Sequence, residues 1–214
     1  MISFIIPAHD EACEIRGTLA ALHAAIAALS LEHEIVVVAD ACNDDTAALA
    51  RAGGARVLVV DHRQIAATRN SGARHARGDC LVFVDADTCV DATLLRAAMS
   101  ALRDGAAGGG ALVRLSGSTT GYQRIAVRVL GWVFRATAIA PGCFIFCTRA
   151  AFDSAGGFDE RYFAGEDVAI SRALARQGRF VILRESVSTS ARKLRTFTAC
   201  EHLRLLLQFA LRGR

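Results

Sequence analysis

Two aspartates, Asp85 and Asp87, directly follow an apolar run in the sequence CLVFVDADTCV (residues 80–90). Carboxylates this close repel each other unless a proton or a cation joins them. Hard oxygen ligands suit Mg²⁺ or Mn²⁺, which take one or two protein carboxylates and complete their shell with water and substrate phosphate. We therefore predict a divalent ion at Asp85 and Asp87 that bridges a diphosphate. The alternative is that Asp85 ends a strand and Asp87 sits in a solvated turn.

A second acidic pair, Glu166 and Asp167, opens the segment GEDVAISRALARQG (165–178), which has helical periodicity. Two carboxylates in the first turn of a helix interact favourably with the helix dipole. On the residues alone this structural interpretation is the simpler one, and a catalytic role is the alternative.

The first hundred residues alternate short apolar runs with helical patterns. Strands are predicted at 2–6, 34–38, 56–60 and 80–84. The helices between and after them run from about Glu11 to Leu29, from an N-cap at Asn43 to Gly53, over 64–76, and from an N-cap at Asp91. Apolar strands that alternate with helices predict βαβ units and a parallel sheet buried on both faces.

The second half is less regular. Helices are predicted over 120–138, from 149, over 165–178 and over about 195–211, and strands at 142–147 and 179–183. We predict a single Rossmann-like α/β domain over 1–183, with a mostly parallel sheet flanked by helices. Its nucleotide-binding half covers about 1–105 and its acceptor half 106–183. A basic C-terminal segment with a helix follows over 184–214.

Ligands of such a sheet bind beyond the carboxyl ends of its strands. Acidic residues follow these ends, so they are expected to converge there: Asp10, Glu11, Asp40, Asp61, Asp85 and Asp87. The first strand is followed by PAHDEA, which lacks the GxGxxG of dinucleotide sites, and the chain has no P-loop. The phosphates of a bound nucleotide must therefore be held in another way.

Composition narrows the class of protein. The net charge of +4 over 214 residues is too small for a nucleic-acid binder. No apolar run approaches the roughly 18 residues that span a bilayer. The N-terminus MISFIIP enters a strand without a basic leader, and the seven cysteines show no paired spacing. These features predict a cytoplasmic protein with reduced thiols.

Four segments, in order, resemble the conserved blocks of the family 2 glycosyltransferases, which have the GT-A fold. The opening FIIPAHDE is similar to Ile-Pro-Ala-Tyr-Asn-Glu, and EIVVVADACNDDT to a block that usually ends Val-Asp-Asp-Gly-Ser-x-Asp-x-Thr. The other two are ATRNSGARHARGDCLVFVDAD and GGFDERYFAGEDVAISRALARQG. The resemblance runs from residue 2 to about 183.

The resemblance implies a metal-dependent enzyme that moves a sugar from a nucleotide-diphosphate sugar to an acceptor hydroxyl with inversion. The donor is expected to be of the UDP or GDP type, and the acceptor a sugar, a lipid or a small molecule. The resemblance implies that Asp85 lies near the ribose and metal and that Asp87 ligates the metal. It also implies that the Glu166–Asp167 pair is catalytic, with Asp167 as the general base. The residues implied to contact the nucleobase and ribose of the donor are Pro7, Ala8, Glu11 and Asp40.

Three further residues are candidates. Arg69 is expected to support the nucleotide, although a polar helix face would also explain it. Related enzymes bring a late basic residue or histidine onto the diphosphate or metal, which implies substrate binding by Arg192 and metal binding by His202. Peripheral contact with the inner face of the membrane becomes credible if the acceptor is a lipid.

Departures from the family pattern leave alternatives open. Ala39 replaces the first aspartate of the usual pair, Asp10 replaces an asparagine and His9 replaces a tyrosine. These changes affect which nucleobase the site would recognise. A non-catalytic nucleotide-sugar binding or scaffold protein is one alternative, but intact acidic pairs argue against it. A sugar nucleotidyltransferase is another, but it would need a glycine-rich, lysine-bearing loop after the first strand.

Overall fold

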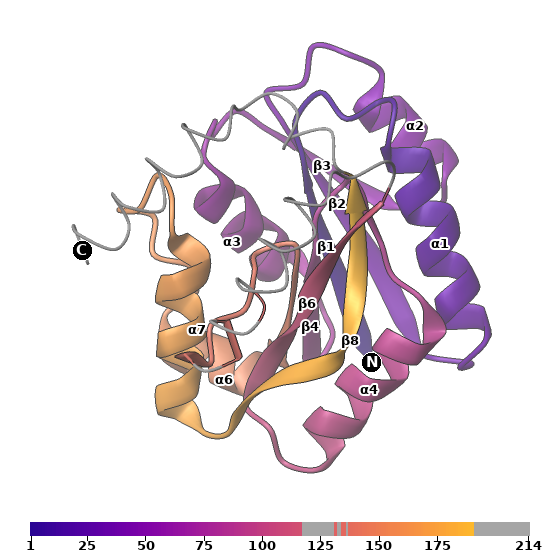
Figure 1. The fold of residues 1–214 in the computed structure, drawn as a ribbon. Coiled ribbons are helices and arrows are strands. Elements are labelled where there is room, and N and C mark those ends of the chain that lie inside the picture. Colours follow the sequence, from indigo (N-terminus) through magenta and orange to yellow (C-terminus); the bar gives the residue numbers. More distant parts are fainter. Residues whose placement is uncertain (117–130, 132–133, 136, 191–214) are drawn as a thin grey trace.

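The fold is an α/β sandwich around one eight-stranded sheet, seen in a computed structural model that describes residues 1–116, 131, 134–135 and 137–190 (Figure 1). The strand order is β3-β2-β1-β4-β7-β6-β8-β5. Four of the seven neighbouring pairs are parallel (β3/β2, β2/β1, β1/β4 and β6/β8). The other three are antiparallel. The predicted α/β class with a mostly parallel sheet is confirmed.

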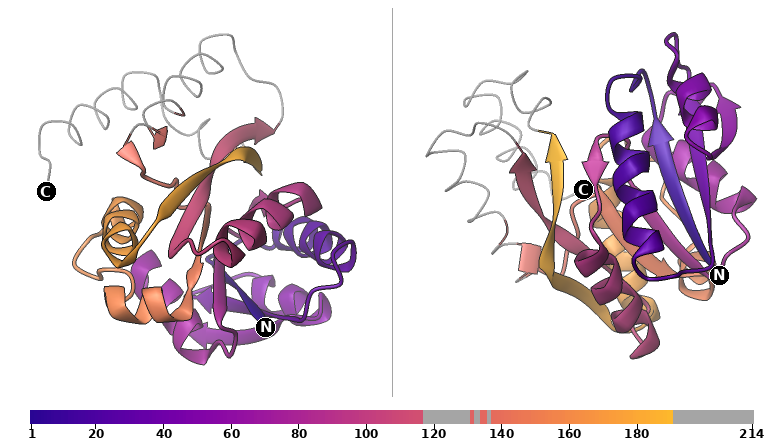
Figure 2. Two further views of the ribbon diagram at one scale, coloured as in Figure 1. Left: turned by 90° about the horizontal axis from the view of Figure 1, so that it is seen from below. Right: turned by 90° about the vertical axis from the view of Figure 1, so that its right-hand side faces the viewer.

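The N-terminal half follows the predicted alternation. Its elements are β1 (Ile2–Ala8), α1 (Ile15–Ala27), β2 (His33–Asp40), α2 (Thr46–Ala52), β3 (Arg56–Val60), α3 (Ile65–His75), β4 (Cys80–Val84), β5 (Thr88–Cys89) and α4 (Ala92–Arg103). Helices cover both faces of the sheet, with α1, α2 and α4 on one side and α3, α6 (Arg149–Ala155) and α7 (Glu166–Gln177) on the other (Figures 1 and 2). The strands β1, β2 and β4 are apolar without alternation because both of their faces are buried.

Two apolar clusters fill the two sides of the sheet. Along β1, Phe4 and Ile6 pack into the cluster beneath α1 and α4, whereas Ile5 packs into the cluster beneath α3, α6 and α7. All three side chains are fully buried. This alternation fixes the sheet between its helices and so fixes the strand ends that carry polar residues.

The C-terminal half adds β6 (Gly108–Ser116), β7 (Phe144–Thr148) and β8 (Phe180–Ser190). β6 was not expected from the sequence, because it opens with three glycines, which are disfavoured in strands. Close approach explains them: a Cβ on Gly109 would lie 2.2 Å from the carbonyl oxygen of Val181, and one on Gly110 2.3 Å from the Cβ of Ala140. β8 extends well beyond the predicted 179–183.

Two helix starts differ from prediction. The first helix begins at Ile15 rather than near Glu11. The predicted N-cap at Asn43 is wrong, because Asp45 is the cap residue of α2 and no acid lies in its first turn. The amide of Asn43 instead donates to Asp10. The cap at Asp91 is confirmed by its bond from the amide of Leu94 at 2.8 Å.

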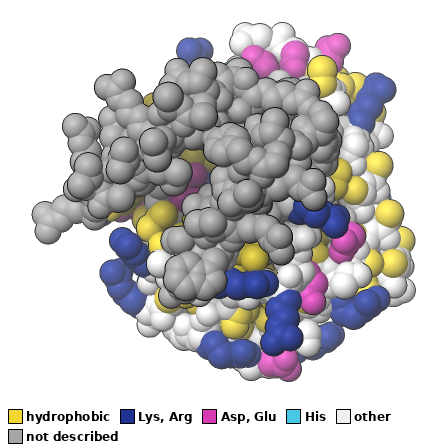
Figure 3. Space-filling view, in the orientation of Figure 1, with side chains coloured by type: hydrophobic (Ala, Val, Ile, Leu, Met, Phe, Trp, Pro, Cys, Tyr) yellow, Lys and Arg dark blue, Asp and Glu magenta, His cyan; other side chains and the backbone are white. Residues whose placement is uncertain are grey.

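The predicted helix over 120–138 lies mostly, and the one over about 195–211 entirely, outside the described residues. Within the described part of the chain, no helix is long and apolar enough to cross a membrane. Basic side chains are spread over the lower part of the face shown in Figure 3.

Candidate functional site

The carboxyl ends of β1, β2 and β4 meet at one edge of the sheet and open into a cavity of about 810 Å³. Residues from six separate segments line it. Eight of them were singled out from the sequence: Pro7, Ala8, Glu11, Asp40, Arg69, Asp85, Glu166 and Asp167. The other three acids expected at this edge, Asp10, Asp61 and Asp87, are not part of the lining.

Asp85 is balanced by a buried arginine. Nη2 of Arg69 lies 2.9 Å from Oδ1 of Asp85, and the arginine side chain is 3% exposed. No donor among the described residues reaches Oδ2 of Asp85, and the side chain is 26% exposed. One carboxylate oxygen therefore belongs to the ion pair, while the second is available to a ligand.

The Glu166–Asp167 pair starts α7, and the chain turns into the helix through Gly165, whose φ of 88° favours glycine. Oε1 of Glu166 accepts from Nη1 of Arg69 at 2.9 Å. Asp167 accepts from the amides of Gly142 at 3.2 Å and Val168 at 2.8 Å. Burial, followed by the neighbouring charge of Glu166, raises the pKa of Asp167 above its usual range. Asp167 is thus a carboxylate in the cavity wall with raised basicity.

Asp40 closes the loop between β3 and α3. Its Oδ1 accepts from the amides of His62 and Arg63 at 2.7 and 3.0 Å. Its Oδ2 accepts from the amide of Gln64 at 3.3 Å and the hydroxyl of Thr68 at 2.6 Å. Burial alone would raise the pKa of Asp40, but these four hydrogen bonds outweigh it and lower the pKa. The carboxylate therefore shapes the cavity wall in addition to lining it.

Asp87, unlike Asp85, is not part of the cavity lining. Its side chain is buried at 5% exposure, and its Oδ1 lies 3.4 Å from the hydroxyl of Thr88 and 3.3 Å from that of Thr189 on β8. The DADT segment therefore sends one carboxylate into the cavity wall and the other towards β8. Two carboxylates separated by one residue still offer the hard oxygen ligands that Mg²⁺ and Mn²⁺ prefer.

The remaining predicted residues divide into two groups. The backbone amide of Glu11, in the loop after β1, donates to the hydroxyl oxygen of Thr46 at 2.8 Å. Pro7 and Ala8 lie at the end of β1 and line the cavity. Arg192 and His202 lie outside the described residues. Their predicted roles therefore stay predictions.

Gly142, which lies in the cavity wall before β7, was not expected at the site from the sequence. Its carbonyl oxygen accepts from Nη2 of Arg69 at 3.0 Å, and its amide donates to Asp167. A Cβ there would lie 3.2 Å from Nη2 of Arg69 and 3.4 Å from the Cβ of Asp167. The only signal in the sequence is the Pro-Gly pair, which reads as an ordinary turn.

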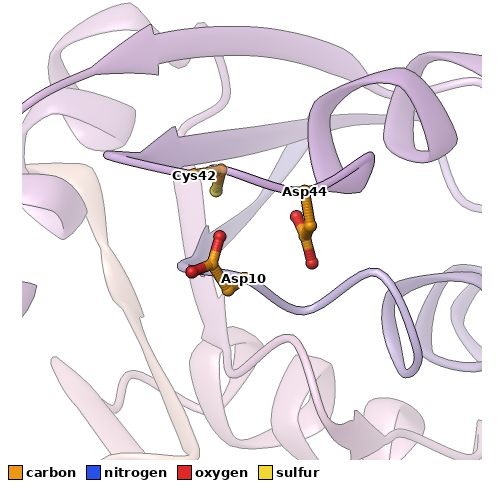
Figure 4. A group of neighbouring side chains, drawn as sticks. All are labelled: Asp10, Cys42 and Asp44. Carbon is orange, nitrogen blue, oxygen red and sulfur yellow. The ribbon is translucent and has the colours of Figure 1, made fainter.

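A separate group of candidate metal ligands lies on the loops after β1 and β2 (Figure 4). Ligand atoms of Asp10, Cys42 and Asp44 lie within 4.8 Å of one another. Both carboxylates already accept backbone hydrogen bonds, Asp10 from Asn43 at 2.7 Å and Asp44 from Ala12 at 3.0 Å. These bonds brace the two loops against each other and account for the clustering without a metal.

The family model for glycosyl transferase family 2 matches residues 3–154, which is more than half of the chain. No curated protein matches the chain at a significant level. The matched range contains the loops after β1, β2 and β4 and ends before α7.

Solved structures share the fold. TarS from S. aureus (residues 1–349) has a TM-score of 0.70 at 19% identity, covering 89% of this chain and 60% of its own. It has also been solved with UDP and with UDP-GlcNAc. The mannosyltransferase PcManGT from Pyrobaculum calidifontis, in complex with GDP-Man and Mn²⁺, has a TM-score of 0.67 at 19% identity and coverages of 88% and 56%.

Glucosyl-3-phosphoglycerate synthase from Mycobacterium tuberculosis, in complex with Mn²⁺, UDP-glucose and phosphoglyceric acid, has a TM-score of 0.63 at 18% identity. The match covers 98% of this chain and 79% of that one. The chain thus spans about three fifths of the length of the TarS structure it matches. At these identities the likeness establishes the fold, which is the GT-A fold expected from the sequence.

Proposed function

The chain belongs to glycosyl transferase family 2, and from this premise we propose that it transfers a sugar from a nucleotide-diphosphate sugar to an acceptor hydroxyl. One observation carries the proposal. A single cavity of about 810 Å³ contains both the family's nucleotide-side residues at the ends of β1, β2 and β4 and the acidic pair at the start of α7. A donor sugar bound between these two sides would be within reach of a base.

Asp167 is the proposed base. As the acceptor oxygen attacks the anomeric carbon and the bond to the diphosphate breaks, the hydroxyl proton passes to the Asp167 carboxylate. Its raised pKa suits this role, because a more basic carboxylate takes a proton more readily. Glu166 completes the catalytic pair by maintaining negative charge beside Asp167. Displacement with the base opposite the leaving group inverts the anomeric configuration.

Asp85 and Asp87 are the proposed ligands of Mg²⁺ or Mn²⁺, with His202 as a further ligand. The carboxylate donor set fits such an ion, and Oδ2 of Asp85 accepts no hydrogen bond from the described residues. When bound, the ion would neutralise charge on the leaving diphosphate. Fold neighbours solved with Mn²⁺ support a divalent ion of this kind.

The proposed donor is of the UDP or GDP type, since fold neighbours were solved with UDP, UDP-GlcNAc, UDP-glucose and GDP-Man. The nucleobase and ribose would be surrounded by Pro7, Ala8, Glu11 and Asp40. Arg192 would reach the diphosphate. The acceptor would be a sugar, a lipid or a small molecule. The proposed location is the cytoplasm, including the inner face of the membrane if the acceptor is a lipid.

The proposal is tested by following release of the nucleoside diphosphate from UDP-glucose, UDP-GlcNAc and GDP-mannose in the presence of Mn²⁺. Transfer to water makes the assay independent of the acceptor. We expect turnover of one donor and a loss of at least about 100-fold in Asp167→Asn. Asp153→Asn, which changes an exposed acid on α6, is the matched control and should retain full activity. Equal activity of Asp167→Asn and wild type would refute the assignment of the base.

A further inference from the structure

Arg69 joins the two sides of the cavity. Its guanidinium donates to Asp85 at the end of β4, to Glu166 at the start of α7 and to the carbonyl of Gly142 before β7, at 2.9, 2.9 and 3.0 Å. These three partners lie far apart in the chain, and Arg69 itself is on α3. One side chain therefore links the proposed metal-binding aspartate to the segment that carries the proposed base.

The link continues to Asp167 through the backbone of Gly142. Gly142 accepts from Arg69 with its carbonyl oxygen and donates to Oδ2 of Asp167 with its amide. Glu166, the other partner of Arg69, is the neighbour of Asp167 in the chain. The position of the Asp167 carboxylate is therefore set from two directions by groups that Arg69 holds.

The guanidinium has little freedom to move. Its side chain is 3% exposed, and its Cζ lies over the ring of Phe158, 5.1 Å from the centroid. A planar fork with fixed donor directions transmits geometry between its partners, whereas a lysine ammonium acts as a single point of charge.

Stability alone does not account for this arrangement. Buried ion pairs often contribute less to stability than apolar residues of the same volume. Moreover, Nε of Arg69 is buried without a hydrogen-bond partner among the described residues, which carries a penalty of its own. A buried arginine that is not fully satisfied, in contact with two cavity carboxylates, indicates a functional role.

We propose that Arg69 is a positioning residue, which sets the relative placement of Asp85 and Asp167 and thereby the alignment of the leaving diphosphate with the attacking hydroxyl. This inference rests on the proposed function. Arg69 acts through Asp85, Glu166 and Gly142, and it need not touch the reacting atoms. Misplacement of reacting groups by about 1 Å can lower a rate by roughly 100-fold.

The matched control is Arg149. Its guanidinium also donates to three protein groups, the carbonyls of Ala73 in the last turn of α3 and of Ala76 and Gly78 beyond its end. It does not line the cavity. Arg149→Lys should therefore lower the melting temperature without changing kcat.

The experiment compares wild type, Arg69→Lys, Arg69→Met and Arg149→Lys in the donor assay, with kcat, donor KM and melting temperature measured for each. We expect Arg69→Lys to remain folded, to lose about 10- to 100-fold in kcat and to change donor KM by less than about threefold. Arg69→Met leaves the carboxylates unbalanced and should lose more. Arg69→Lys carries the test if Arg69→Met does not fold.

Glu166→Gln tests the coupling, since it removes the negative charge that pairs with Arg69 while keeping an oxygen that can accept the hydrogen bond. The effects of Arg69→Lys and Glu166→Gln on kcat should be non-additive, because both act on the same contact.

The outcomes separate the two proposals. An active wild type with normal kcat in Arg69→Lys would overturn the positioning role and leave the proposed function intact. A loss of activity in Arg69→Lys that only follows loss of folded protein would likewise overturn it, by assigning Arg69 a structural role. A wild type inactive towards every donor would overturn the proposed function and this inference with it.

Discussion

The hydroxyl of Thr68 donates to the Asp40 carboxylate at 2.6 Å, which ties the first turn of α3 to the end of β2. The same carboxylate accepts three consecutive backbone amides, from His62 to Gln64. One aspartate therefore shapes the loop that forms a wall of the cavity.

Asp40→Asn should destabilise the protein by about 2–3 kcal/mol, because one amide oxygen cannot replace two charged oxygens that serve four donors. Chemical denaturation measures this loss. Asp61→Asn, on the exposed part of the same loop, is the control and should change stability by less than about 0.5 kcal/mol. A similar loss in both variants would mean that the four hydrogen bonds contribute little.

The lowered pKa of Asp40 also predicts a pH dependence of stability. A carboxylate with a lowered pKa in the folded state stabilises the protein above the ordinary aspartate pKa of about 3.9. That contribution is lost as pH falls through the lower, folded-state pKa. Asp40→Asn should therefore show a weaker fall in stability than wild type between about pH 5 and pH 2. Parallel curves for the two proteins would contradict this assignment.

The raised pKa of Asp167 predicts the acid limb of the activity profile. A protonated base cannot accept the hydroxyl proton, so kcat/KM should fall as pH drops through a pKa above the ordinary value of about 3.9. Glu166→Gln removes the negative charge that helps to raise this pKa. The limb should then move to lower pH, and a limb that stays in place or moves upward would argue against Asp167 as the titrating base.

Gly142→Ala should lower kcat by about tenfold with a modest loss of stability of roughly 1 kcal/mol. Its Cβ would lie 3.2 Å from Nη2 of Arg69, which is closer than an ordinary contact, and 3.4 Å from the Cβ of Asp167. Gly17→Ala on α1 is the control, since nothing lies within 4 Å of its Cβ. It should leave activity unchanged and raise stability by about 0.5–1 kcal/mol. Full activity in Gly142→Ala would show that the site tolerates displacement of these groups.

The sequence predicted the parallel strands and the meeting of Glu11, Asp40 and Asp85 at one edge, because apolar periodicity places strand ends and parallel strands end together. Asp10, Asp61 and Asp87 were expected at the same edge but do not line the cavity. Asp167, at the start of a helix, was predicted only from the resemblance to the family.

The sequence did not predict β6, whose glycines are selected by contact with Val181 and Ala140 rather than by strand propensity. Nor did it predict that Arg69 pairs with Asp85, since such contacts depend on helix rotation and side-chain rotamers. The predicted N-cap at Asn43 was wrong because Asn43 lies in the loop before α2, where its backbone amide donates to Asp10 and Asp45 is the cap residue.

The proposed metal-assisted nucleotide site is tested most directly by calorimetric titration of UDP, GDP, dTDP and CDP into the full chain, with and without Mn²⁺. Wild type is compared with Asp85→Asn and Asp87→Asn, and folding of each variant is checked by circular dichroism. We predict that one diphosphate binds, that Mn²⁺ strengthens its binding at least tenfold, and that each folded variant loses this Mn²⁺ dependence. Binding of no nucleotide, or binding that ignores both Mn²⁺ and the two aspartates, would contradict a metal-assisted glycosyltransferase site.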